Sequence, residues 1–407
     1  MAAILAWNKG EADMSALAIA ERELQMRVLD SLAAIDAAAD AWRDLEARCN
    51  DELTFFQTLS WCRSWVAEFA SDGRIEPHIR TAWRGDKLVA IWPLMRTSGP
   101  LGVQMLETLG DPHSQYTNML CDPADDCCAA SNILMKGLAD AGRCDVAVLK
   151  AVPRSSQLGQ ALATRHRADA DFNEAAILDL SRFESSEAYT KSLRKLQKRN
   201  RNRRRNHLAR HGELTFEVLW PSDAGYAERL STCMAMKRRW LMETGRYSAG
   251  FALDGYEAFL AQLDGDASTC TGACLSVLSC GGRAVAVELG FILNRHYYAY
   301  IGGFDWDLRS HSPGKVQMDM TVCWLIDNGI AAYDLLGNVA DYKQSWTNRT
   351  VALSAHTIPM SWRGQLFASV WLNGLRPLAK RLYTRIPEAW RRVVFVGQRL
   401  SALVLFI

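Results

Sequence analysis

The stretch from Arg283 to Trp346 constrains the fold of this chain most. It begins with two runs rich in β-branched and aromatic residues, 283–293 and 296–304. Between them stands Asn294-Arg295, a pair that favours a tight hairpin turn. The segment therefore predicts two antiparallel strands joined by a short turn, followed by a helix and another strand, which is an arrangement typical of an α/β domain.

The segment 312–315, Ser-Pro-Gly-Lys, predicts the start of that helix. It offers a capping hydroxyl, a proline suited to the first helical position and a glycine that lets the backbone approach a ligand. Asn328-Gly329 is expected to end the helix, and a short strand, 331–336, to follow. Two interpretations remain: an anion site at the positive end of the helix, or an ordinary helix start.

The chain has 407 residues, which favours two domains over one. The order of predicted elements in the first half is repeated in the second half, although no residue-by-residue repeat is present. The expected divisions are an N-terminal extension, an N-terminal α/β domain, a catalytic α/β domain and basic amphipathic C-terminal helices, at 1–25, 26–183, 184–360 and 361–407.

Composition excludes several classes of protein. Hydrophobic residues make up 49% and charged residues 23%, which indicates a globular chain. The 11 cysteines form no CxxC pairs, and Cys270, Cys274 and Cys280 have no histidine at ligand spacing, so no metal site is expected. Reduced thiols indicate a cytoplasmic protein. No apolar run reaches the roughly 20 residues that span a bilayer.

The net charge of +2 conceals two basic segments. Lys191–Arg210 contains ten Lys or Arg and no acidic residue, and 361–407 contains eight against Glu388 alone. The first segment could bind an anionic polymer, CoA phosphates or tRNA, or be a solvated helix, and it lacks the interleaved aromatic residues that base stacking needs. The second either packs on the catalytic domain or lies on an anionic membrane face, as in a protein peripheral to the inner membrane.

An ordered series of motifs resembles the CelD/BcsL-type acetyltransferases of the GNAT superfamily. In the second half it comprises the basic helix 193–210, Arg239-Trp240, 286–291 (AVELGF), 297–305, 312–315, Tyr333-Asp334 and 342–346 (YKQSW). The first half matches more loosely, through 55–65, 92–95 and Ser114-Gln115-Tyr116. The family is similar in architecture to FemAB-like peptidyltransferases, so the resemblance implies an α/β fold of two tandem GNAT-like domains with mixed central sheets.

The resemblance implies an acyltransferase that moves an acetyl or other acyl group from acyl-CoA to a sugar hydroxyl or amine, in exopolysaccharide, cellulose or cell-envelope metabolism. Two alternatives stay open: an aminoacyl-tRNA-dependent FemAB-like transferase, and a non-catalytic accessory protein that binds an anionic polymer. Arg309, Ser312, Gly314 and Lys315 are the expected acyl-CoA contacts. Only Arg309 and Gly314 are left of the usual GNAT phosphate loop.

Acyl transfer needs a base for the acceptor and an acid for the leaving thiolate. Glu288 is the candidate base, or else an outward-facing strand carboxylate. Tyr342 is the candidate acid, or else a packed tyrosine. Asp334 and Lys343 act in catalysis or form a structural pair. His296 and His311 are further candidates, with the alternative that His296, at a turn, is simply solvated.

The resemblance also places substrate contacts at Arg239, Trp240, Tyr116 and Trp346. The acceptor, the acyl length and the oligomeric state are left open.

Overall fold

The computed structural model describes residues 24–71, 73–99, 102–136, 138, 144–169, 173–337 and 346–370. Within these, the chain divides into two compact units. The first comprises the residues up to Asn173 and those from Ala352 onward, and the second comprises Glu174–Val351. The predicted N-terminal extension and most of the basic C-terminal segment lie outside the described residues.

The first unit contains two sheets. One has the strand order β1-β3-β4-β7, and in the other the order is β16-β8-β6-β5-β2, with β6 and β8 parallel. Pro93 separates β4 from β5, which belong to different sheets. The strands are β1 Leu24–Leu29, β2 Ile75–Pro77, β3 Ile79–Arg84, β4 Lys87–Trp92, β5 Leu94–Ser98, β6 Gln104–Thr108, β7 Leu120–Cys121, β8 Val146–Pro153 and β16 Arg349–Pro359.

The helices of the first unit begin at polar caps. Ser31, Thr58, Asp126, Ser156 and Ser361 each accept a backbone N–H in the first turn of a helix. The helices are α2 Leu32–Ala37, α3 Ala39–Arg48, α4 Leu59–Phe69, α5 Cys127–Met135, α6 Gln157–Ala163 and α13 Trp362–Leu366, with the 3₁₀ turn η1 Phe55–Gln57.

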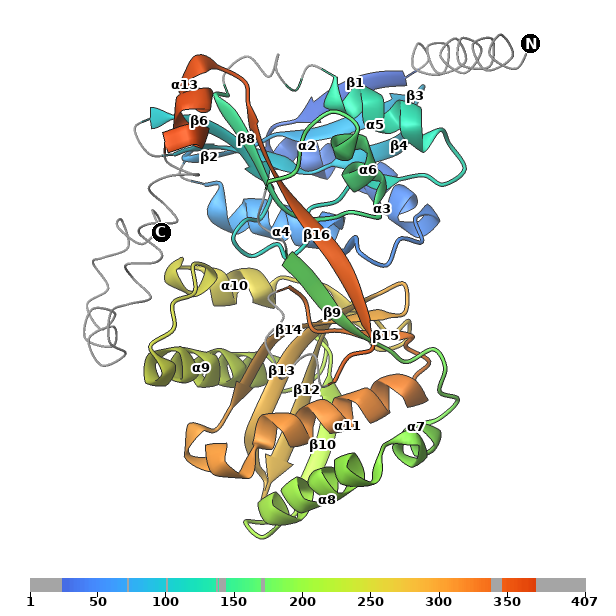
Figure 1. The fold of residues 1–407 in the computed structure, drawn as a ribbon, viewed down its shortest axis with the longest axis vertical. Coiled ribbons are helices and arrows are strands. Elements are labelled where there is room, and N and C mark those ends of the chain that lie inside the picture. Colours follow the sequence, from blue (N-terminus) through green and yellow to red (C-terminus); the bar gives the residue numbers. More distant parts are fainter. Residues whose placement is uncertain are drawn as a thin grey trace. The chain divides into compact units, whose positions relative to one another are not determined.

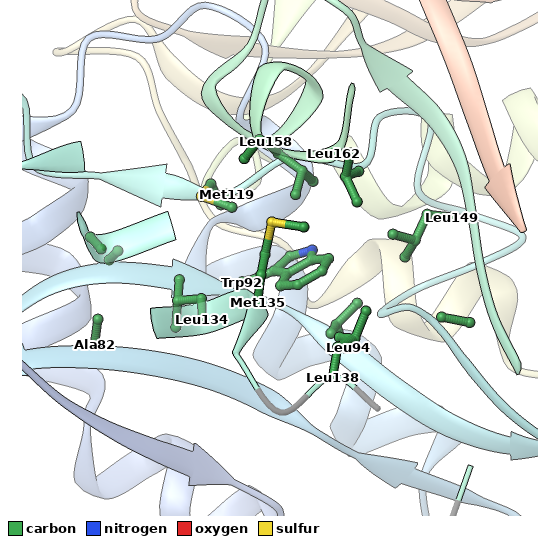
Figure 2. Packing of buried hydrophobic residues seen from close by; sticks show 14 of the residues in the cluster. Ala82, Trp92, Leu94, Met119, Leu134, Met135, Leu138, Leu149, Leu158 and Leu162 are labelled. Atoms are coloured by element: carbon green, nitrogen blue, oxygen red, sulfur yellow. The ribbon is translucent and has the colours of Figure 1, made fainter. Parts of the chain in front are cut away.

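Trp92 lies at the centre of the first unit's core. Its ring is surrounded by aliphatic side chains of β5, β8, α5 and α6, among them Leu94, Leu149, Leu134 and Leu162 (Figure 2). All of these are fully buried. Burial of such side chains against both helices and sheet is the main stabilising contribution to this unit.

The second unit is a mixed sheet with the order β10-β12-β13-β14-β15-β9, in which β14 and β15 are parallel. Helices α9 and α11 lie on opposite sides of strands β12 to β14 (Figure 1). The strands are β9 Asn173–Asp179, β10 Leu214–Leu219, β11 Gly265–Asp266, β12 Thr271–Cys280, β13 Arg283–Leu293, β14 His296–Phe304 and β15 Ala332–Asp334. The helices are α7 Ser186–Ser192, α8 Lys195–Ala209, α9 Tyr226–Thr244, α10 Tyr256–Ala261 and α11 Pro313–Asp327, with 3₁₀ turns η3 Gly250–Ala252 and η4 Trp306–His311.

The predicted hairpin is confirmed. Strands β13 and β14 have the predicted bounds, and Asn294 and Arg295 both have positive φ, 51° and 61°, as a two-residue hairpin turn requires. Helix α11 begins at Pro313 and ends before Asn328-Gly329, also as predicted. Helix α9 begins after Gly225, an N-cap residue in the left-handed conformation.

The basic segment forms α8, which lies along α11 (Figure 1). Arg201 of α8 bonds to Asp319 of α11 at 2.6 Å, and both side chains are about 85% buried, at 15% and 16% exposure. His211, just beyond the end of α8, meets His311 at 3.1 Å between their Nε2 atoms. The two helices therefore run in opposite directions, and α11 supplies α8 with an acidic partner that α8 itself lacks.

Candidate functional site

Glu288 of β13 points into the second unit, toward α11. Its side chain is 6% exposed, and two tyrosines donate hydrogen bonds to its carboxylate: Tyr297 to Oε1 at 3.0 Å, and Tyr333 to both oxygens at 3.1 Å. The alternative of an outward-facing carboxylate is therefore wrong. The strand alternates as the sequence predicts, but the face that carries Glu288 is the one that α11 covers.

The two tyrosines are held by stacking and by a glycine. The rings of Tyr297 on β14 and Tyr333 on β15 are stacked, with centroids 5.4 Å apart and planes 8° from parallel. A Cβ at Gly290 would lie 2.1 Å from the Tyr297 ring, so only glycine leaves room for it there. The geometry of the hydroxyls around Glu288 is therefore fixed by packing.

A second polar cluster lies beside Glu288, between the sheet and α11. Gln317 donates to Ser276 at 2.6 Å and to Thr321 at 2.7 Å, and Thr321 donates to Ser276 at 3.0 Å. Ser276 is the β12 residue directly opposite Glu288, and all three side chains are buried. A continuous layer of hydroxyl, amide and carboxyl groups thus replaces apolar packing at the centre of this face.

Burial raises the pKa of Glu288 to about 7. Hydrogen bonds from Tyr297, Tyr333 and Gln317 act in the opposite direction, because they favour the ionised carboxylate. A carboxyl group that titrates near neutral pH can accept a proton and release it again under physiological conditions. Its environment therefore suits a general base.

An exposed glycine lies beside one oxygen of Glu288. Gly302 stands opposite Glu288 in the β13–β14 pairing and is exposed, and a Cβ placed on it would lie 3.8 Å from Oε2. The register shifts just beyond this pair, between Leu289 and Gly290, where β14 contains one extra residue. Bulges of this kind change the direction of side chains next to a site. A reacting group could reach Glu288 past Gly302.

His296 and Asp334 form a buried pair. Their Nε2 and Oδ2 atoms are 3.0 Å apart and the side chains are 1% and 0% exposed. Asp334 also accepts the backbone N–H of Leu336 at 2.7 Å. The alternative that His296 is simply solvated is wrong, because parallel pairing of β14 with β15 brings it beside Asp334. Lys343, the other proposed partner of Asp334, and Tyr342 lie outside the described residues.

At the start of α11, the residues predicted to contact phosphate are not arranged as a loop of backbone N–H donors around an anion. Ser312 is at the N-cap position with a φ of 56°, and its hydroxyl makes no capping bond to the described helix, so the capping prediction is wrong. A Cβ at Gly314 would make only ordinary contact with Phe304, at 3.5 Å. Arg309 folds back to donate to the carbonyl of Trp306 at 3.0 Å. Lys315 is exposed and faces the basic side chains of α8.

The predicted substrate contacts are distributed over both units. Arg239 forms a two-pronged ion pair with Asp307, at 3.1 and 2.7 Å. Two cations lie over the ring of Trp240, Lys237 at 4.3 Å and Arg246 at 5.0 Å from its centroid.

The remaining two predicted contacts differ in exposure. Tyr116, in the first unit, is fully buried beside Phe56 and presents no surface to a ligand. Trp346 is half-buried and lines a cavity of the second unit together with α8. Sequence reasoning missed Tyr297 and Gln317, whose roles depend on contacts across strands. It also missed the cavity.

Comparison with known proteins gives a family match for most of the second unit. Residues 195–344, which include Glu288, both of its tyrosine donors and α11, match the family described as acetyltransferase (GNAT) domain. The second unit has a GNAT-like fold. No curated protein matches the chain. The match supports an acyltransferase, and the candidate base lies inside the matched GNAT domain.

Solved structures extend the likeness of fold beyond the GNAT domain. The crystal structure of FemX is similar at 12% identity and a TM-score of 0.56, over 85% of this chain and 99% of that chain. The C-terminal domain of a putative lysylphosphatidylglycerol synthetase from Agrobacterium fabrum is similar at 14% identity and a TM-score of 0.53, over 82% and 95%. The predicted α/β fold of tandem GNAT-like domains with mixed sheets is confirmed.

Two kinds of feature are absent from the described residues. None of their helices combines the length and the apolar character that a membrane span requires. No group of three histidine, cysteine or carboxylate side chains among them is placed to hold a metal ion.

Proposed function

We propose that the GNAT domain transfers an acyl group from an acyl-CoA to a hydroxyl or amine acceptor, with Glu288 as the general base. The observation that carries the proposal is a carboxyl group with a pKa of about 7, held by two tyrosine hydroxyls and lying beside an exposed glycine. These features lie in a domain that matches an acetyltransferase family.

In the proposed step, Glu288 takes the proton of the acceptor as its oxygen or nitrogen bonds to the thioester carbonyl carbon. The carbon–sulfur bond then breaks and the thiolate leaves. Tyr297 and Tyr333 keep the carboxylate in place and stabilise its charged form before the proton arrives. Tyr342 stays the proposed acid for the thiolate, and Arg309, Ser312, Gly314 and Lys315 stay proposed contacts of the phosphates.

The acceptor class is proposed from the resemblance to CelD/BcsL-type enzymes: a sugar hydroxyl or amine in polysaccharide or cell-envelope metabolism, with the protein in the cytoplasm. A second candidate is transfer from aminoacyl-tRNA. The fold shared with FemX and the acid-free basic helix α8 favour it.

The deciding experiment measures thiol release from acetyl-CoA with amino sugars, neutral sugars and amines as acceptors, and in parallel transfer from charged tRNA. Wild-type protein and Glu288→Gln are compared in each. Acceptor-dependent thiol release that Glu288→Gln lacks supports the first candidate. Transfer from charged tRNA alone supports the second, and activity of Glu288→Gln equal to wild type contradicts Glu288 as base in either.

A further inference from the structure

A cavity of about 570 Å³ lies within the second unit, where α7 and the first turns of α8 meet β9 and residues 346–348. We call it the α8 cavity. Its volume is in the range of small-molecule sites. It is separate from Glu288, Tyr297 and Tyr333, none of which lines it.

The charge of the α8 cavity has one sign. Among the described residues, no acidic side chain lines the cavity. Four arginines do: Arg182, Arg194, Arg201 and Arg204. Guanidinium groups bind phosphate through paired N–H donors. The lining therefore selects an anion, and phosphate suits it best.

The cationic lining continues toward α11 in a second hollow of about 270 Å³. Arg201 and Arg204 line both, and the second adds Lys198, Arg205 and Lys315. Its one acidic side chain, Asp319, is already bonded to Arg201 at 2.6 Å. A ligand with more than one phosphate could extend along this path.

The fold also supplies the aromatic surface that the basic segment lacks in sequence. Phe183 and Trp346, both half-buried, line the α8 cavity from outside α8, and Tyr189 forms its floor. Tyr189 packs edge-to-face on Phe183, with centroids 5.1 Å apart, and lies 5.5 Å beneath the Arg201 guanidinium. Flat rings beside arginines are the arrangement on which nucleobases stack.

Amide side chains complete the set. Gln197, Asn200 and Asn348 line the same cavity and can donate to or accept from the edge of a base. We infer that the α8 cavity binds a nucleotide unit, with its base against Phe183 and Trp346 and its phosphates on the arginines of α8. Two sources share this chemistry, the nucleotide end of CoA and an unpaired end of RNA.

The first experiment measures binding of ADP by calorimetry, with adenosine and inorganic pyrophosphate as comparisons. ADP should bind at least about tenfold more tightly than either, because only ADP has both phosphates for the arginines and a base for the aromatic rings. Pyrophosphate binding as tightly as ADP would overturn the nucleotide assignment. Competition against ADP by CoA, or by a short single-stranded oligoribonucleotide, then shows which of the two ligands supplies the nucleotide unit. Either result supports the site.

Neighbouring arginines give a matched control. Arg204 lines the cavity, whereas Arg203 is exposed and lines neither hollow, so Arg204→Gln and Arg203→Gln change the charge of α8 equally. Arg204→Gln should weaken ADP binding about tenfold and lower its salt dependence, and Arg203→Gln should stay within about twofold of wild type. Equal weakening by both would show a diffuse electrostatic effect and overturn the site.

The aromatic wall is tested by Trp346→Leu against Trp362→Leu, a tryptophan of the first unit that is 77% exposed. Loss of ADP affinity in the first variant alone supports stacking, provided its circular dichroism is unchanged. ADP binding is also measured in Glu288→Gln. Full affinity in that inactive variant separates this site from the proposed function, so either can fail without the other.

Discussion

Tyr333 donates its hydroxyl hydrogen to the Glu288 carboxylate and lies 3.1 Å from each of its oxygens. The two residues come from strands that are not neighbours, since β14 separates β13 from β15. The bond thus crosses the face of the sheet. It depends on the parallel pairing of β14 and β15, which places Tyr333 directly beside Tyr297.

Glu288→Gln should lower the turnover number by about 100-fold or more, following the usual contribution of a positioned base. Glutamine keeps the shape of the side chain and the packing around it, so CoA affinity should change little. Initial rates and calorimetry on the same preparation check both points. Loss of activity together with unfolding would assign Glu288 to the core instead of to catalysis.

Tyr333→Phe should raise the pKa of Glu288 further, because it removes a donor that favours the ionised carboxylate. The rising limb of the pH–rate profile, expected near pH 7 in the wild type from the pKa of Glu288, should move to higher pH. Tyr226→Phe, at a buried tyrosine of α9 away from this cluster, serves as the control. Identical profiles in all three proteins would contradict the role of Tyr333.

Stability should fall as the pH rises from about 4.5 to 7. Glu288 has a raised pKa when folded, about 7 against an ordinary 4.5, so the folded chain holds the proton that the unfolded chain releases in this range. At about 1.4 kcal/mol per pKa unit, this lowers the free energy of unfolding by about 3 kcal/mol above pH 7. Urea unfolding of wild type and Glu288→Gln across this range measures it. The difference between the two proteins should vary with pH by that amount, and a constant difference would show that the carboxyl does not titrate near 7.

Gly302→Val should reduce turnover while leaving the fold intact. A valine side chain would add atoms on the Oε2 side of Glu288, where Gly302 carries no Cβ. Gly302→Ala should have an intermediate effect, because its Cβ would be in ordinary contact at 3.8 Å. Rates and thermal midpoints of both variants check this, and full activity in Gly302→Val would place the approach to Glu288 elsewhere.

Asp334→Ala should destabilise the protein by about 1–3 kcal/mol, because a buried polar partner of His296 is lost. Asp334→Asn keeps an oxygen acceptor for His296 and should cost less. Denaturant unfolding of the two variants measures the difference. Equal costs would show that the carboxylate oxygen contributes little to the pair.

The features of this protein that were predicted correctly from its sequence depend on residues close together in the chain. The hairpin at Asn294-Arg295 and the ends of α11 depend on residues next to each other in the chain, and both were predicted correctly. The face of the sheet on which Glu288 lies and the burial of His296 were not predicted, because each depends on a residue about 40 positions away. For Glu288, alternation gave two faces without telling which one α11 covers.

The missing side chain at Gly290 couples two positions of the sheet. The ring of Tyr297 occupies the space that any Cβ at 290 would need, so a change at one position limits what the other can hold. Selection for recovered folding in a Gly290→Ala background should first return smaller residues at 297. Such revertants would regain stability and lose a proton donor to Glu288. The route that repairs the fold would thereby alter the acidity of its central carboxyl group.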